Sequence, residues 1–186
     1  MKEFIDDKVL FLERFVKSPR YVGSVTPSWP LLARAMIKPI DWLNMHSIVE
    51  LGAGTGVFTK YIYQLKHNDC KGIIFERDDV MRERLMQTYE GLNYRSRAED
   101  IYPVIQELGL EQVDCILSGL PFANFPQSYC NQILDGVANS LKPGGLFIQF
   151  QYSLQMKSQL LKRFSRVDVG FVPLNIPPAF IYYCYK

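Results

Sequence analysis

Three glycines that follow a short apolar segment constrain this chain more than any other feature. Residues 48 to 56 read Ile-Val-Glu-Leu-Gly-Ala-Gly-Thr-Gly, and a helical pattern starts at Val57. Glycine lets a backbone turn where a Cβ atom would collide with a ligand, and a helix N-terminus presents free N–H groups that favour an anionic group. The segment therefore predicts a strand, a tight turn and a helix that together hold a nucleotide-like ligand.

A carboxylate follows this turn at a spacing typical of nucleotide-binding folds. A second strand is predicted at Gly72 to Phe75, and the next residue is Glu76, about 20 residues after Gly56. In βαβ units roughly this distance separates the glycine turn from an acid that binds a ribose. The alternative is a structural turn with a coincidental acid. The Gly-x-Gly-x-Gly spacing also differs from the Gly-x-Gly-x-x-Gly of dinucleotide-binding proteins.

The string Glu50-Leu-Gly-Ala-Gly-Thr-Gly56 resembles the first motif of class I S-adenosylmethionine-dependent methyltransferases. The resemblance implies S-adenosyl-L-methionine as the cofactor. It assigns cofactor binding to Glu50, Gly52, Ala53, Gly54, Thr55, Gly56, Glu76, Arg77, Ala98, Glu99, Ser118 and Gly119. In the family's usual form an acid stands where this chain has Arg97, so Glu99, Asp100 or backbone atoms are the candidates for the adenine contact. The same two acids can instead cap the following helix.

The rest of the chain alternates predicted strands and helices, which favours an α/β fold with a mostly parallel sheet. Strands are predicted at 47–51, 72–75, 93–97, 113–117, 145–151, 166–172 and 179–185, and helices at 29–37, 57–67, 78–90, 101–108, 127–141 and 154–164. Leu141-Lys-Pro-Gly-Gly145 predicts a helix stop and turn. The last two strands are joined by too few residues for a parallel crossover, so they should form an antiparallel hairpin.

These elements predict a Rossmann-like class I methyltransferase fold with seven strands, the last one antiparallel, and helices on both faces. We expect a single methyltransferase domain over 1–186, with a helical cap at 1–40 and the core at 41–186. The length of 186 residues and the 48% of hydrophobic residues suit one domain with a full core.

Composition argues against several classes of function. The net charge of +2 gives no sign of nucleic-acid binding. The four cysteines are far apart, with no C-x-x-C pair, so neither a metal site nor a disulfide framework is predicted, and we expect reduced, buried thiols. With no secretory signal and no apolar run of about 20 residues, we expect a cytoplasmic protein, either soluble or peripheral at the inner membrane face.

The segment Ser118-Gly-Leu-Pro-Phe122 carries the information on the acceptor. Enzymes that methylate adenine amines place Asn or Asp where this chain has Gly119, and they stack the base on an aromatic residue. The Leu-Pro-Phe part keeps a partial resemblance to rRNA adenine dimethyltransferases. Because Gly119 has no side-chain acceptor, base methylation is the less favoured alternative.

The longer string Ser118-Gly-Leu-Pro-Phe-Ala-Asn-Phe-Pro126 resembles the bacterial phospholipid N-methyltransferases, as do Tyr21 to Ser28 and Leu174-Asn-Ile-Pro-Pro-Ala-Phe-Ile-Tyr182. This resemblance covers about residue 10 to the C-terminus. It implies methylation of a lipid head-group amine such as that of phosphatidylethanolamine. It assigns acceptor binding to Tyr21, Leu120, Pro121 and Phe122, and it leaves Tyr21, Ser118 and Phe122 as catalytic candidates.

Other functions stay open at this point. The acceptor can be an RNA adenine or a small soluble amine, and a non-catalytic S-adenosylmethionine-binding module would have the same cofactor motif. Apolar residues of the first helix, among them Phe4, Phe11 and Phe15, gather on one side. That helix is interpreted as lying on a bilayer, as capping the domain, or as a mobile lid.

Overall fold

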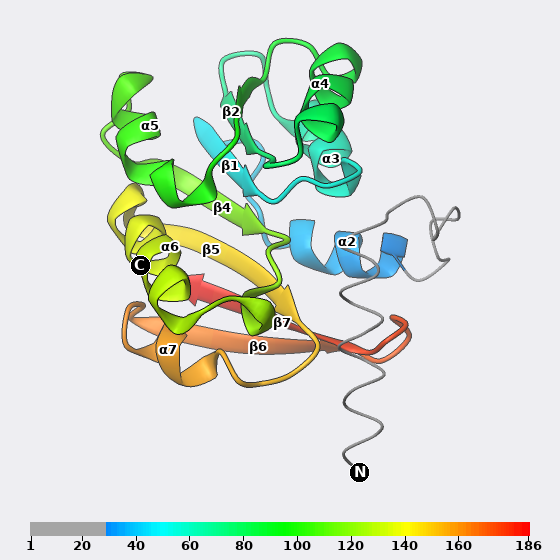
Figure 1. The fold of residues 1–186 in the computed structure, drawn as a ribbon, viewed down its shortest axis with the longest axis vertical. Coiled ribbons are helices and arrows are strands. Elements are labelled where there is room, and N and C mark those ends of the chain that lie inside the picture. The colour runs from blue at the N-terminus through cyan, green and yellow to red at the C-terminus, as the bar shows by residue number, and fades with distance from the viewer. Residues whose placement is uncertain (1–28) are drawn as a thin grey trace.

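In the computed structural model, which describes residues 29–186, the strands form one mixed sheet. Their order across the sheet is β3-β2-β1-β4-β5-β7-β6, and β7 runs antiparallel to both of its neighbours (Figure 1). The strands are β1 (Ser47–Leu51), β2 (Lys71–Phe75), β3 (Asn93–Arg95), β4 (Val113–Ser118), β5 (Leu141–Gln151), β6 (Arg166–Val172) and β7 (Ala179–Tyr185). The predicted seven-stranded sheet with a reversed last strand is confirmed.

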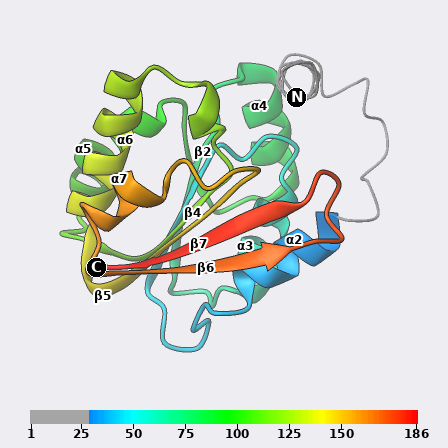
Figure 2. The same cartoon turned by 90° about the horizontal axis from the view of Figure 1, so that it is seen from below.

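Helices cover both faces of this sheet (Figures 1 and 2). One face carries α2 (Trp29–Ile37), α3 (Val57–Leu65) and α4 (Asp79–Thr88), and the other carries α5 (Ile101–Glu107), α6 (Gln127–Ser140) and α7 (Lys157–Leu161). Two short 3₁₀ turns, η2 (Ala98–Asp100) and η3 (Phe122–Asn124), follow β3 and β4. Each face has its own hydrophobic cluster, because side chains alternate between the two faces along every strand. No helix in residues 29–186 is both long enough and apolar enough to cross a membrane.

The largest departure from the predicted elements is at Leu141-Lys-Pro-Gly-Gly145. The helix stops there as expected, at Ser140, but the segment is the irregular start of β5 and not a separate turn. Leu141 is buried and pairs with Val113, and the register then shifts before Leu146 pairs with Cys115. Gly144 has the left-handed φ of 76° that this bulge requires. The helix-stopping residues are evident in the sequence, but the pairing of this segment with β4 is not.

Most of the predicted helices and the third strand are somewhat shorter in the structure, and α7 and β3 show the physical reason. The helix predicted at 154–164 is reduced to α7, and residues 162–164 continue it only as a turn, with Arg163 and Phe164 both donating to the carbonyl of Leu160. The third strand ends at Arg95 and not at Arg97, because only Asn93, Tyr94 and Arg95 pair with β2. The N-terminal helix and Tyr21 lie outside the described residues.

Candidate active site

The glycine turn after β1 lies at the carboxyl edge of the sheet, where β1, β2 and β4 end. Gly52, Gly54 and Gly56 all have positive φ angles, of 75°, 55° and 86°. A Cβ on Gly52 would lie 2.7 Å from Leu120 Cδ2, and one on Gly56 would lie 2.5 Å from Leu85 Cδ2. At Gly54 a Cβ would meet no heavy atom within 4 Å. The outer glycines are therefore fixed by packing, whereas Gly54 borders open space that a ligand can enter.

Glu76 lies directly beside that open position. Its Oε2 accepts a 2.6 Å hydrogen bond from the Gly54 N–H, and its Oε1 accepts one of 2.9 Å from the Asp78 N–H. The residue is largely buried, and the β2 backbone just before it accepts from Gly52 and Ala53. Each carboxylate oxygen has two acceptor sites, so each keeps one for a ribose hydroxyl. This arrangement fits the ribose role that the sequence assigns to Glu76.

Glu50 is fully buried beneath the turn, on the face covered by α3. Burial raises its pKa to about 8, although the 2.6 Å hydrogen bond that Thr59 donates to its Oε2 acts in the opposite direction. The nearby charge of Glu76 raises the pKa further. Oε1 of Glu50 has no hydrogen-bond partner among the described residues. Glu50 thus supports the turn from below as a mostly protonated acid near neutral pH.

The end of β4 lies against the glycine turn, and this contact explains Gly119. The Gly119 N–H donates to the Leu51 carbonyl at 2.9 Å, and a Cβ at position 119 would lie 2.9 Å from the Gly52 carbonyl oxygen. A side chain there would push the two loops apart. Close backbone packing therefore requires glycine at position 119, where adenine methylases have Asn.

The neighbouring acceptor candidates differ in accessibility. Ser118 is fully buried, and its Oγ accepts from the Leu120 N–H at 3.3 Å. Leu120 and Pro121 are partly exposed at the sheet edge. Phe122 is buried and makes an edge-to-face contact with Phe125 at 6.0 Å between ring centroids. The structure thus places Leu120 and Pro121 at the open edge, and Ser118 and Phe122 in the interior below it.

Beyond β3, the acid expected near the adenine has two protein partners. Tyr129 donates to Glu99 Oε2 at 2.7 Å, and the Arg97 guanidinium contacts Oε1 at 3.0 Å. Burial would raise the pKa of Glu99, but hydrogen bonds from its own backbone, Tyr129 and Arg97 outweigh this effect and lower it. The pKa of Tyr129 is raised to about 12 by burial and by this bond. Asp100 makes no side-chain cap, and the Arg77 side chain is exposed.

Sequence reasoning missed a polar group on β5, beneath the same edge. Gln151 is buried and donates from Nε2 to the Leu120 carbonyl at 2.9 Å, so it holds the loop after β4 in place. Gln149 is fully buried beside Ser118 on β4 and Tyr182 on β7, and its amide has no partner among the described residues. Two glutamines two residues apart in an otherwise apolar strand are the signal that could have found them.

The cysteines and the possible metal-binding clusters can be described within residues 29–186. All four cysteines are free and buried, as expected. Burial raises the pKa of the Cys115 thiol and of the Cys184 thiol, which keeps both protonated. Within the same residues no cluster of three His, Cys, Asp or Glu side chains could hold a metal ion.

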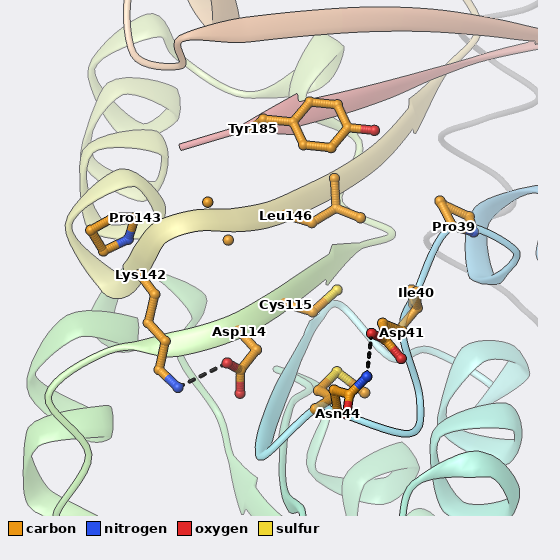
Figure 3. A pocket seen from close by; sticks show the side chains of 13 residues that line it. Pro39, Ile40, Asp41, Asn44, Asp114, Cys115, Lys142, Pro143, Leu146 and Tyr185 are labelled. Carbon is orange, nitrogen blue, oxygen red and sulfur yellow. Dashed lines mark hydrogen bonds and ion pairs between the residues drawn. The ribbon is translucent and has the colours of Figure 1, made fainter.

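A pocket of about 310 Å³ opens at the opposite, amino-terminal edge of the sheet (Figure 3). Asp114 lies in its wall and is saturated by protein donors, which are the N–H groups of His46 and Ser47, the Ser47 hydroxyl and the Lys142 ammonium. This pocket lies at the opposite ends of the strands from Gly54 and Glu76. Its polar groups tie strands together, so we assign it no part in the chemistry.

Comparison with known proteins agrees with this site. Residues 48–145 match the family described as a methyltransferase domain. The ornithine lipid N-methyltransferase of Singulisphaera acidiphila is 35% identical over 189 aligned residues, which cover 99% of this chain and 96% of that protein. The match thus extends over nearly the whole length of both chains.

Solved structures share the fold at low identity. The 1,6-didemethyltoxoflavin-N1-methyltransferase of Burkholderia thailandensis, solved with 1,6-didemethyltoxoflavin and S-adenosylhomocysteine, gives a TM-score of 0.71 at 12% identity over 100% of this chain and 89% of that one. The N-methyltransferase NodS of Bradyrhizobium japonicum gives 0.68 at 12% identity, over 87% of this chain and 98% of that one. Given the glycine turn, its acid and these matches, this chain belongs to the class I S-adenosylmethionine-dependent methyltransferases, close to the lipid N-methyltransferases.

Proposed function

We propose that this enzyme methylates the amine of a lipid head group. The observation that carries the proposal is the end-to-end similarity to an ornithine lipid N-methyltransferase, at 35% identity over 99% of the chain. Gly119 supports it from the structure, because the close approach to Gly52 leaves no room for the side-chain acceptor that adenine amines require. Phosphatidylethanolamine and ornithine lipid both offer a suitable amine.

The cofactor would lie over the open side of the glycine turn. When bound, S-adenosylmethionine would supply a methyl group on a sulfonium sulfur, so that the acceptor nitrogen would take the methyl carbon while the carbon–sulfur bond breaks and S-adenosylhomocysteine leaves. Glu76 would accept hydrogen bonds from the ribose hydroxyls. Gly54, which has no side chain, would let the ligand approach the backbone closely. Arg77, Ala98 and Glu99 would border the adenine, and Ser118 and Gly119 would support the end nearest the acceptor.

The acceptor side of this edge suits a neutral amine. Leu120 and Pro121 are uncharged and partly exposed, and Gln151 holds the Leu120 carbonyl in place. An amine attacks only as the free base, and an apolar surface disfavours its protonated form. Phe122 would act by supporting this loop from the core. Tyr21 keeps its predicted role as an acceptor or proton contact, outside the described residues.

We also infer that residues 1–186 act as one methyltransferase unit, in which 41–186 form the core and 1–40 a helical cap. Peripheral association with a membrane belongs to this proposal, because the acceptor amine stays attached to a lipid. The enzyme must then bring the carboxyl edge of its sheet to the head groups.

The test is transfer of labelled methyl from S-adenosylmethionine to vesicles that contain phosphatidylethanolamine or ornithine lipid, with ribosomal RNA and a panel of small amines assayed in parallel. Label in the lipid fraction is the expected result, and the two lipids distinguish the head groups. Label only in RNA or in a soluble amine would overturn the lipid assignment and leave the methyltransferase standing.

The Phe122→Leu variant should retain activity in the same methyl-transfer assay, because it keeps an apolar side chain in the core.

A further inference from the structure

The end of β6 and the turn that joins it to β7 expose three large apolar side chains. Leu174 and Ile176 each keep 71% of their surface exposed, and Phe171 keeps 54%. We call these three residues the apolar tip. Isolated exposed hydrophobic residues are ordinary, but three within six positions of one turn form a patch that needs an explanation.

The turn is built to hold these side chains outward. Asn175, between Leu174 and Ile176, is almost completely buried. Its Nδ2 donates to the Pro177 carbonyl at 2.7 Å, and its backbone N–H donates to the Val172 carbonyl at 3.3 Å. At the base, the rings of Phe171 and Phe180 are in contact, 4.9 Å apart. Burying the polar residue fixes the turn and leaves its two aliphatic neighbours facing solvent.

The tip also lacks the charges that usually solvate a surface hairpin. Residues 169–185 include no Asp, Glu, Lys, Arg or His. A hydrocarbon layer accepts such a segment, because no charged group has to be desolvated when it enters.

The tip lies at the same edge of the sheet as the glycine turn. Because β7 is antiparallel to β5, its first residues adjoin the end of β5, where Phe180 pairs with Gln151. The turn that precedes β7 therefore lies beyond the carboxyl ends of the parallel strands. Figures 1 and 2 both show it beside the first residues of α2. A surface that met this tip would also face Leu120 and Pro121.

Three side chains are too few for a stable protein interface, which takes about 800 Å² from each partner. Insertion into a bilayer needs no such area, since each aliphatic side chain that leaves water for the bilayer contributes separately to binding. We propose that the apolar tip inserts into the head-group region of a lipid bilayer and turns the carboxyl edge of the sheet toward the lipid amines. This inference rests on the proposed lipid acceptor.

The experiment uses the full chain with a single new cysteine at position 174. The native cysteines are buried, so a polarity-sensitive fluorophore can be placed selectively on Leu174→Cys. The matched control is Leu43→Cys, since Leu43 is 85% exposed in the loop before β1, at the opposite edge. With vesicles of phosphatidylethanolamine and phosphatidylglycerol, the label at 174 should shift to shorter wavelength and the label at 43 should not.

A functional comparison accompanies the spectroscopic one. The double variant Leu174→Ser/Ile176→Ser should partition to vesicles at least about tenfold more weakly than Leu43→Ser. Its methyl transfer to vesicle lipid should fall, while transfer to the same lipid in detergent micelles should stay unchanged. That last result separates loss of docking from loss of the folded site.

Other outcomes would separate the docking proposal from the proposed lipid function. If lipid is methylated but the label at 174 does not respond to vesicles, the docking proposal is wrong and the lipid function stands. If the label responds but no lipid is methylated, the tip binds membranes and the acceptor assignment fails. A label at 174 that is already shielded in buffer, or shielded as protein concentration rises, would show that the chain itself or a second copy covers the tip, which overturns the proposal.

Discussion

At the scale of single residues, the contact between Glu76 and Gly54 gives the first test of the cofactor site. Glu76→Ala removes a charged acceptor, so the dissociation constant of S-adenosylmethionine should rise by an amount equivalent to roughly 1 to 3 kcal/mol. Calorimetric titration measures it. Glu76→Gln can still accept from the Gly54 N–H, so its dissociation constant should lie between those of Glu76→Ala and the wild type. Glu83→Ala is the matched control, because Glu83 is exposed on α4. An unchanged constant in Glu76→Ala would exclude the ribose role.

Glu50 predicts how stability depends on pH. Its folded-state pKa of about 8 lies above the ordinary value of 4.5 for a glutamate, so the unfolded chain loses this proton first. The wild type should lose up to about 1.4 kcal/mol of unfolding free energy per pH unit between those values. Glu50→Gln can still accept from Thr59 and does not titrate.

Denaturant unfolding at a series of pH values measures this effect. The advantage of Glu50→Gln over the wild type should grow from pH 4.5 to about 8 and then level off. Below pH 4.5 both states carry the proton, so the difference should stay constant there. Parallel curves across the whole range would mean that Glu50 is ionised in the folded protein.

At the scale of elements, Asp114 joins the starts of three strands at the edge opposite the cofactor. From β4 it accepts from His46 and Ser47, at the start of β1, and from Lys142 on β5. Burial opposes ionisation, but the hydrogen bonds from Lys142, Ser47 and His46 outweigh it and lower the pKa of Asp114. The stability that Asp114 contributes is therefore present above its unfolded pKa of about 3.8 and is lost as pH falls through the folded value.

Asp114→Ala should lower the free energy of unfolding at pH 7 by about 2 to 3 kcal/mol, because several donors lose a charged acceptor. Asp41→Ala is the control, since Asp41 is exposed and accepts only from Asn44 among side chains of the described residues. Its effect should stay within about 0.5 kcal/mol. Because the sheet separates the two edges, cofactor affinity of the folded Asp114→Ala protein should not change. Equal stability of the two variants would contradict the bridging role of Asp114.

Elements were predicted well wherever local chemistry alone determines them. The glycine turn, the start of α6 at Gln127 and the reversal before Ala179 all follow from short-range turn and connection rules. Gly145 shows where such rules end. A Cβ there would lie 2.9 Å from the Lys142 carbonyl and 3.2 Å from the Asp114 carbonyl, so its role depends on a strand distant in sequence. The burial of Phe122 could not be predicted for the same reason, since only tertiary packing decides whether an aromatic residue is buried or faces a ligand.

At the scale of the whole molecule, the sequence predicted a mostly parallel sheet of alternating strands and helices. It did not predict which polar residues from different strands would contact one another. Gln151 and Leu120 are far apart in the chain, and their contact exists only because β4 and β5 are neighbours. Glu99 and Tyr129 are also far apart in the chain, and they meet because α6 packs against η2. Resemblance to a family supplied the predicted cofactor residues, which stay a prediction, whereas their protein partners came only from the structure.

The position of β7 has a consequence for how the sheet opens. Because β7 lies between β5 and β6, β6 joins the sheet only through β7. Any fluctuation that separates β7 from β5 must therefore release both strands together. In native-state hydrogen exchange, amides of Arg166–Val172 and Ala179–Tyr185 should share one opening free energy, lower than that of β1 and β4 in the sheet centre. One shared energy would make the last hairpin a cooperative unit that detaches from an intact five-stranded remainder. Two unrelated opening energies would argue against this coupling.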